Sequence, residues 1–210
     1  MKYSHIFLDF DETLFDHDAY FAWADKVLTE RFAVPAGSFA GQTGDYHDVV
    51  APLMRLYRHS DHIEDVTKRS WQFMSGELEH ELRESGLDFC YPETHETLRW
   101  LVGLDAEVRI LTFGHGEYQR YKINTCPVLH ELRIPVHVVN QAKADFLATE
   151  FGDVGHGVLV DDKHPLNLPA KWDEVWIDRS SQVPEPKKLS GKTHKISTLK
   201  QLRELVKQDT

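Results

Sequence analysis

Short, nearly continuous apolar runs recur along this chain, with helical patterns between them. The runs are HIFLDF, EVRILTF, PVHVV, GVLV and EVWI, at residues 5–10, 107–113, 135–139, 157–160 and 174–177. Runs of this kind suit strands that are buried on both faces, and their alternation with helices is typical of a parallel sheet. The sequence therefore predicts an α/β fold with a Rossmann-like parallel sheet flanked by helices.

Three segments after the first strand have helical spacing of their apolar residues. They are residues 92–104, residues 141–151 and a closing stretch that begins after Thr198. Gln201 stands three residues after Thr198, which is the spacing of a capping box. Residues 180–193 are polar and contain prolines, so we expect a loop there, followed by a last strand and a closing helix.

Residues 17–88 differ in texture from the rest of the chain, because they contain several helical patterns and no clear strand. A chain of 210 residues can form one sizeable core that carries a smaller inserted unit. We therefore expect an α/β core built from residues 1–16 and 89–210, with residues 17–88 as an inserted all-α domain.

The composition limits the partners of the protein. With 34 acidic and 24 basic residues the formal charge is −10, which would repel a nucleic-acid backbone. No apolar run approaches the roughly 20 residues of a membrane span, and the start of the chain lacks the apolar core of a signal peptide. Cys90 and Cys126 form no CxxC motif, so we expect no disulfide framework, no cysteine zinc site and a cytoplasmic location.

Acidic residues follow two of the predicted strands. Asp9 and Asp11 come at the end of the first strand, and Asp161 and Asp162 directly follow GVLV. Open α/β sheets bind their ligands at the carboxyl ends of the strands. Paired carboxylates repel one another unless a cation or a shared proton accommodates them, and hard oxygen ligands suit magnesium. A solvated turn after each strand is the structural alternative.

Two further polar residues stand at or after strand ends. Thr112 closes the strand at 107–113, and Lys143 comes soon after the strand at 135–139. A threonine hydroxyl there could donate to a phosphoryl oxygen, and a lysine could neutralise a carboxylate and an incoming phosphate. Taken singly, such a threonine usually satisfies backbone groups, and such a lysine is usually solvated.

The order of these fragments along the chain resembles that of the haloacid dehalogenase superfamily. The first motif of that family, DxDxT, matches Asp9, Asp11 and Thr13. The second motif, a Thr or Ser that ends a strand, matches Thr112, and the third, a Lys or Arg, matches Lys143. The fourth motif, an acidic pair, matches Asp161–Asp162, so that the resemblance covers residues 6–162.

The resemblance implies a role for each matched residue. Asp9 would be the nucleophile and Asp11 the general acid and base. Magnesium would bind Asp9, the backbone carbonyl of Asp11 and a carboxylate of the fourth motif, for which we expect Asp162 to bind directly and Asp161 through water. The phosphoryl group would lie against these residues: Thr112, Lys143, Thr13, Phe113 and Gly114. Glu12 stands where many relatives have glycine, and residues 17–88 would be a helical cap that shapes specificity.

These roles predict a magnesium-dependent phosphomonoester hydrolase that acts on a small phosphorylated metabolite through an aspartyl-phosphate intermediate. A phosphotransferase or phosphomutase would use the same residues, and a non-catalytic scaffold on this fold is the remaining alternative. A dehalogenase has no need of Asp11 or of the metal. The sequence does not identify the substrate, the oligomeric state or the part that Arg55 and Arg58 play in binding.

Overall fold

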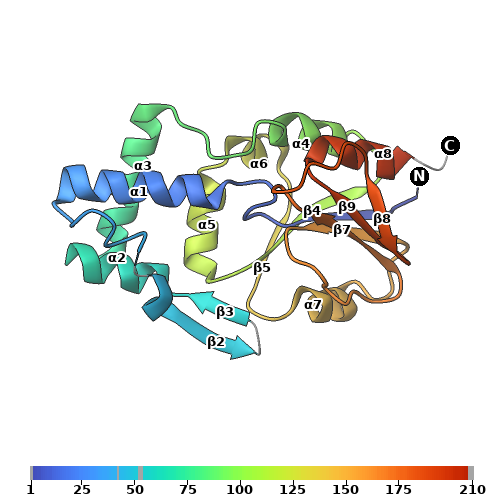
Figure 1. The fold of residues 1–210 in the computed structure, drawn as a ribbon, viewed down its shortest axis with the longest axis horizontal. Coiled ribbons are helices and arrows are strands. Elements are labelled where there is room, and N and C mark those ends of the chain that lie inside the picture. Colours follow the sequence, from blue (N-terminus) through green and yellow to red (C-terminus); the bar gives the residue numbers. More distant parts are fainter. Residues whose placement is uncertain (1, 42, 52–53, 208–210) are drawn as a thin grey trace. The chain divides into compact units, whose positions relative to one another are not determined.

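A computed structural model describes residues 2–41, 43–51 and 54–207 and divides the chain into two compact units (Figure 1). The first unit consists of Met1–Phe15, Cys90–Phe113 and Pro127–Thr210. The second consists of Asp16–Phe89 and Gly114–Cys126.

The first unit is built on a seven-stranded sheet with the order β5-β4-β1-β6-β7-β9-β8. All neighbouring strands are parallel except β8, which runs antiparallel to β9, so the predicted parallel α/β sheet is confirmed. The strands are β1 (His5–Leu8), β4 (Glu107–Phe113), β5 (Val136–Val139), β6 (Gly157–Asp161), β7 (Trp172–Ile177), β8 (Lys187–Ser190) and β9 (Thr193–Ile196).

Strand β8 lies inside the segment that the sequence predicts as a loop. All four of its residues are exposed, because it is the edge strand of the sheet. An exposed edge strand has no buried face and therefore no apolar pattern from which it could be predicted.

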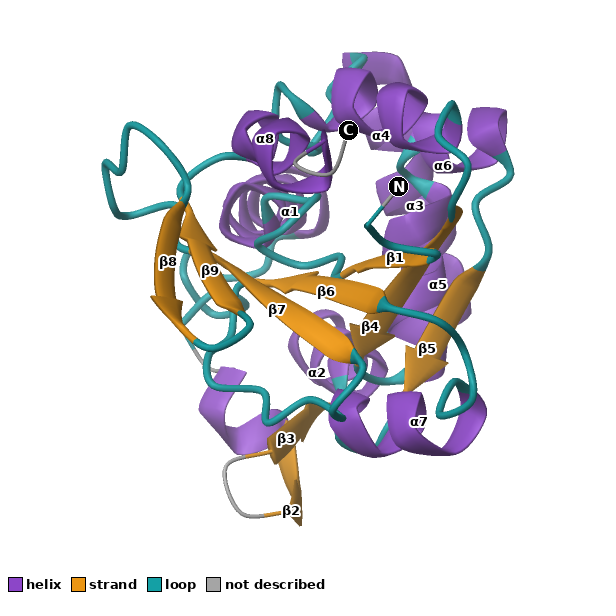
Figure 2. Cartoon of the chain, turned by 90° about the vertical axis from the view of Figure 1, so that its right-hand side faces the viewer, coloured by secondary structure: helices purple, strands orange, loops and turns teal. Residues whose placement is uncertain are grey.

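Helices cover both faces of this sheet (Figure 2). Helix α7 (Lys143–Glu150) lies on one face, and α4 (Thr94–Val102) and α8 (Leu202–Lys207) lie on the other. Helix α6 (Pro127–Leu132) completes the unit, and a 3₁₀ turn at Leu199–Gln201 precedes α8. The predicted capping box is confirmed, with Thr198 and Gln201 as its two members.

The central strands are buried on both faces, which explains their continuous apolar sequences. On the α7 face, Phe7 of β1 packs in a cluster of buried side chains and meets the Trp172 ring edge-on, with the ring centroids 5.3 Å apart. The other members of the cluster are Leu111, Val139, Leu147 and Leu159. Gly157 is needed here, because a Cβ atom at this position would lie 2.6 Å from the Trp172 ring.

The second unit contains four helices within the described residues and a β-hairpin. The elements are α1 (His17–Phe32), a 3₁₀ turn (Thr43–Tyr46), β2 (His47–Ala51), β3 (Met54–Tyr57), α2 (His59–Thr67), α3 (Trp71–Ser85) and α5 (Gly116–Asn124). The expectation of an all-α insertion is therefore wrong. None of the hairpin residues whose burial is described is buried, and Val49 is 72% exposed, so the hairpin has no buried face that would mark it as a strand pair.

The insertion is also not a single stretch of chain, since residues 114–126 group with it. Helix α5 packs there through Tyr118, whose ring stacks on that of His59 with the centroids 3.7 Å apart. A contact between residues so far apart in the chain cannot be predicted from local sequence patterns.

The structure bears on two expectations from composition, which concern membrane spans and disulfides. Across the described ranges, no helix is both long and apolar enough to cross a membrane. Cys90 and Cys126 are both disulfide-bonded, although their spacing in the sequence indicates no disulfide framework. Their isolation in the sequence carried no information about pairing, which depends on proximity in the folded chain.

Candidate active site

The sheet brings the predicted acidic residues together at one edge. Leu8 of β1 pairs with Val160 of β6, so the next residues in register, Asp9 and Asp161, lie side by side where the two strands end. The chain leaves β1 toward β4 and leaves β6 toward β7, on opposite sides. Such a switch point is where open α/β sheets hold their ligands.

A lysine ammonium bridges two of the carboxylates. Nζ of Lys143, the first residue of α7, lies 2.7 Å from Oδ1 of Asp9 and 2.6 Å from Oδ2 of Asp161. All three residues are buried, with exposures of 9% for Lys143, 6% for Asp9 and 0% for Asp161. The lysine that sequence alone would leave as a solvated residue is therefore part of the site.

The two oxygens of Asp9 differ in their surroundings. Oδ1 accepts a hydrogen bond from the backbone N–H of Phe10 at 2.7 Å, in addition to its contact with Lys143. Among the described residues, none donates a hydrogen bond to Oδ2. Oδ2 is thus the oxygen left for binding or attack.

The two residues of the second acidic pair are also held differently. Oδ2 of Asp161 accepts from Lys143, and its Oδ1 accepts from the backbone N–H of Lys163 at 2.8 Å. Asp162 pairs through Oδ2 with Nζ of Lys163 at 2.5 Å, and that lysine side chain is 76% exposed. Protein groups therefore engage both oxygens of Asp161, whereas the partner of Asp162 is an exposed lysine side chain.

The carboxylates of Asp9, Asp161 and Asp162 form a group in which one oxygen of each lies within 4.8 Å of the others. Burial raises the pKa of the Asp9 carboxyl well above its ordinary value, and the nearby charges of Asp161 and Asp162 add to this effect, while Lys143 opposes it. Burial also raises the pKa of Asp162. Burial alone would lower the pKa of Lys143, but the charges of Asp161 and Asp9 outweigh it and keep the ammonium charged.

Asp11 lies in the tight turn that follows β1. The N–H of Leu14 and that of Phe15 both donate to the carbonyl of Phe10, at 2.9 and 3.0 Å, and the N–H of Glu12 donates to the carbonyl of Phe15 at 2.8 Å. Glu12 has a φ of 57°, in the left-handed region that glycine adopts most easily.

Two threonine hydroxyls at this edge are buried. Within the described chain, Oγ1 of Thr112 and Oγ1 of Thr13 have no hydrogen-bond partner. Leaving a buried hydroxyl unpaired costs about 1–3 kcal/mol, so each is suited to a bound acceptor. Phe113 ends β4 and is partly exposed, whereas Gly114 belongs to the second unit, where the position of its missing Cβ is filled by the side chain of Gln119.

Two residues of this region are absent from the sequence predictions. Lys163 directly follows the acidic pair and contacts both of its members. Arg179 stands two residues after the end of β7, at the same edge of the sheet, and donates to backbone carbonyls of the turn at 11–15. Position after a strand end is the sequence feature that could have indicated both. Arg58, in contrast, is engaged by Asp48 and Asp61 of its own unit.

The architecture and the site define the fold class, and solved structures agree with it. No family model matches the sequence, and no curated protein matches it. The chain nevertheless has the haloacid dehalogenase-like fold, which it shares over nearly its full length with several solved structures.

One of these is a protein of Burkholderia xenovorans LB400 named as a haloacid dehalogenase-like hydrolase, with 20% identity over 97% of this chain and 96% of that one and a TM-score of 0.63. The HAD-hydrolase YfnB of Bacillus subtilis, bound to magnesium, has 13% identity over 98% and 99% and a TM-score of 0.65. The L-2-haloacid dehalogenase of Xanthobacter autotrophicus, with chloropropionic acid covalently bound, has 12% identity over 99% and 100% and a TM-score of 0.54.

Replacing Asp9 with Asn is expected to stabilise the metal-free protein at neutral pH. The raised pKa of Asp9 means that stability falls as the pH rises from the ordinary carboxyl range through the folded-state pKa, and Asn removes this loss. Its Oδ1 still accepts from Phe10 and Lys143. In chelator at pH 7 the melting temperature should rise by a few degrees, since about 1 kcal/mol corresponds to 2–4 °C at this size.

The rise in melting temperature of Asp9→Asn should shrink as the pH falls to the ordinary carboxyl range and below, where Asp9 is protonated in both the folded and the unfolded state. Asp178→Asn is the matched control, because it removes one negative charge from the same unit but breaks an ion pair with Lys195 that lowers the pKa of Asp178. It should not stabilise the protein. An unchanged or lower melting temperature for Asp9→Asn at pH 7 would contradict the raised pKa of the Asp9 carboxyl.

Proposed function

We propose that the protein is a magnesium-dependent phosphomonoester hydrolase that acts through an aspartyl-phosphate on Asp9. The observation that carries the proposal is the buried Asp9–Lys143–Asp161 network, with Asp162 beside it. A buried carboxylate held by an ammonium at the carboxyl edge of a sheet is an activated group rather than a solvated turn. The ammonium also supplies positive charge for an incoming phosphate.

The donor set fits a hard divalent cation. Three carboxylates lie beside one buried ammonium, that of Lys143, and one exposed ammonium, that of Lys163, so the group carries excess negative charge. One oxygen of each carboxylate lies within 4.8 Å of the others. Asp9 and Asp162 would hold the ion directly, together with the backbone carbonyl of Asp11, and Asp161 would reach it through water. When bound, magnesium would neutralise the carboxylates and the phosphate. The magnesium bound to YfnB of Bacillus subtilis supports this choice of metal.

The chain's own residues account for the two chemical steps. Oδ2 of Asp9 attacks phosphorus and the bond to the leaving oxygen breaks, while Asp11 gives that oxygen a proton. Asp11 then takes a proton from the water that attacks the aspartyl-phosphate, which releases inorganic phosphate and restores Asp9. Lys143 and the hydroxyl of Thr112 would bind the phosphoryl oxygens throughout.

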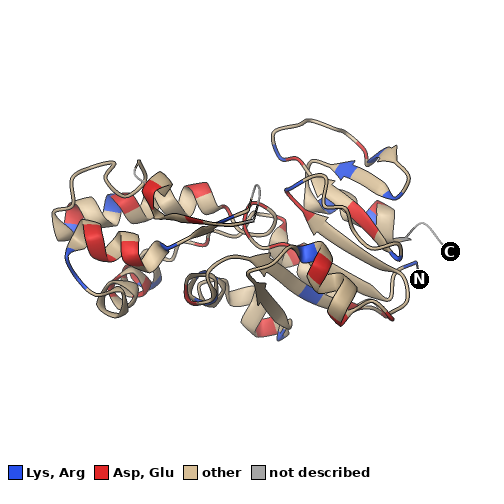
Figure 3. Ribbon diagram, turned by 90° about the horizontal axis from the view of Figure 1, so that it is seen from below, with Lys and Arg blue, Asp and Glu red and all other residues tan. Residues whose placement is uncertain are grey.

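The proposed substrate is a small phosphorylated metabolite. Nucleic acid is a poor partner for a chain of charge −10, and Lys and Arg are scattered over both units rather than collected on one element (Figure 3). In this proposal residues 17–88, with residues 114–126, serve as a cap that selects the substrate. A phosphotransferase would differ only in using a hydroxyl acceptor in place of water.

The test is to assay the purified protein on an aryl phosphate and on 2-chloropropionate, each with magnesium and with excess chelator. We expect phosphate release that depends on magnesium and no halide release in either condition. The dehalogenase with chloropropionic acid bound makes the second substrate the relevant comparison. Undiminished phosphate release in chelator would contradict the metal assignment, and halide release would contradict the reaction class.

The two residues of the acidic pair should contribute unequally to magnesium binding. Asp162→Asn should weaken magnesium binding more than Asp161→Asn does, because protein donors already engage both oxygens of Asp161. Loss of an indirect ligand typically costs 10–100-fold in affinity, and loss of a direct one should exceed this. Calorimetric titration of magnesium into both variants decides the ranking, and the reverse order would make Asp161 the direct ligand.

A further inference from the structure

The turn that carries Asp11 contains an unfavourable backbone conformation. Glu12, the next residue, is left-handed with a φ of 57°, which costs a residue other than glycine about 1–2 kcal/mol. Such a conformation persists only where surrounding contacts hold it. The contacts around Glu12 therefore determine where the backbone of Asp11 lies.

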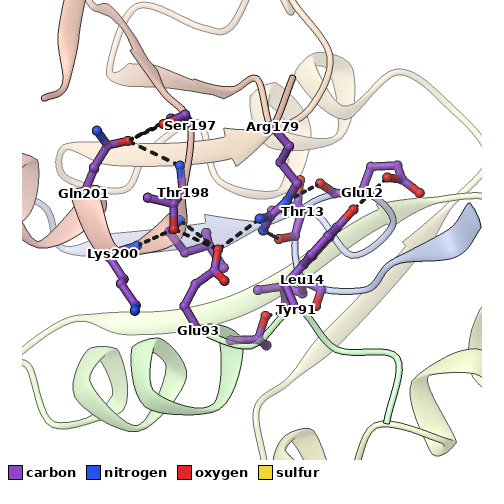
Figure 4. Close-up of polar contacts among 12 residues, drawn as sticks. Glu12, Thr13, Leu14, Tyr91, Glu93, Arg179, Ser197, Thr198, Lys200 and Gln201 are labelled. Atoms are coloured by element: carbon purple, nitrogen blue, oxygen red, sulfur yellow. Dashed lines mark hydrogen bonds and ion pairs between the residues drawn. The ribbon is translucent and has the colours of Figure 1, made fainter. Parts of the chain in front are cut away.

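Arg179 supplies two of the hydrogen bonds to the backbone of this turn. Its Nε donates to the carbonyl of Glu12 at 3.0 Å, and its Nη2 donates to the carbonyl of Thr13 at 2.5 Å (Figure 4). These are the two carbonyls that immediately follow Asp11 in the chain. A charged donor strengthens such hydrogen bonds roughly twofold over neutral ones.

The guanidinium is itself held on two sides. Its third nitrogen, Nη1, donates to Oε1 of Glu93 at 2.9 Å, and its carbon lies 3.4 Å from the ring centroid of Tyr91. The hydroxyl of Tyr91 donates to Oε2 of Glu12 at 2.8 Å. The side chain of Glu12 and its carbonyl are thus tied to one stacked Tyr91–Arg179 pair.

Glu93 is held in turn by the segment that begins the closing helix. Its Oε1 also accepts from the hydroxyl of Thr198 at 2.9 Å, and Gln201 holds the backbone N–H groups of Ser197 and Thr198 at 2.8 and 3.2 Å (Figure 4). Burial would raise the pKa of Glu93, but the hydrogen bonds from Arg179 and Thr198 outweigh it and keep the carboxyl ionised. A continuous set of bonds therefore runs from the closing helical segment to the turn.

We propose that Arg179 is a positioning residue for the reaction, which holds the turn of residues 11–15 so that Asp11 faces the reacting group. The inference rests on the proposed function of Asp11 as general acid and base. All three guanidinium nitrogens of Arg179 have separate partners. The planar fork of arginine is therefore required, and a lysine ammonium cannot replace it.

The experiment compares Arg179→Met and Arg179→Lys with the wild type on an aryl and an alkyl phosphate. The alkyl leaving group needs protonation by Asp11 and the aryl one needs little, so kcat/KM should fall by about 10²-fold for the alkyl ester and much less for the aryl ester. Lysine should not restore the loss. Arg203→Met is the matched control, because Arg203 also pairs with a glutamate and lies over an aromatic ring in the same unit.

A second readout does not depend on activity. Amide hydrogen exchange at Glu12, Leu14 and Phe15, whose N–H groups are bonded within the turn, should become faster in both Arg179 variants and stay unchanged in the control. Equal losses for the two esters, or unchanged exchange, would overturn the proposal. Where Arg179→Met does not fold, Glu93→Gln serves as the milder variant and should shift both readouts in the same direction.

The two proposals fail in different ways. A wild-type protein that hydrolyses neither ester overturns the proposed function, and the exchange rates then decide by themselves whether Arg179 holds the turn. A wild-type protein that hydrolyses both esters, with an Arg179→Met variant that loses the two activities equally, overturns the positioning role alone.

Discussion

The buried ammonium of Lys143 is the interaction on which the rest of the site depends. It lies between the carboxylates of Asp9 and Asp161, and removing the ammonium would leave two buried carboxylates without a cation, a kind of change that typically costs 3–5 kcal/mol. Lys143 begins α7, where the helix dipole disfavours a cation. The two carboxylates outweigh that effect, so the lysine is held by the site and not by its helix. Strand β5, which leads into α7, thereby contributes to a centre formed mainly by β1 and β6.

Much of this centre follows from strand patterns in the sequence. Because β1 and β6 are buried on both faces, their apolar runs are continuous, and each run ends at the acidic residue that matters. The parallel sheet then brings Asp9 and Asp161 to the same edge. What the pattern does not contain is the strand order, which makes β1 and β6 neighbours although some 150 residues separate them in the chain.

Other features have no local signature. The hairpin of β2 and β3 has no buried residue among those described, α5 packs through a ring contact with a residue distant in sequence, and the two cysteines stand far apart in sequence. Arg179 is a similar case, since one arginine after a strand is usually solvated. Only the fold shows that its three nitrogens meet two carbonyls and a carboxylate. Residues that act through other residues are defined by proximity in space, which no spacing rule encodes.

The central claim is that Asp9 is the nucleophile and Asp11 its acid and base, and intact-protein mass spectrometry tests it most directly. After incubation with magnesium and an aryl phosphate, Asp11→Asn should retain covalent phosphate on Asp9. The aryl leaving group departs with little protonation, so the first step needs little help from Asp11. The water that attacks in the second step still needs a base, and the help of that base is typically worth about 10²–10⁴ in rate. Asp9→Asn should gain no mass. Phosphate found on a serine or histidine, or on neither variant, would contradict the account.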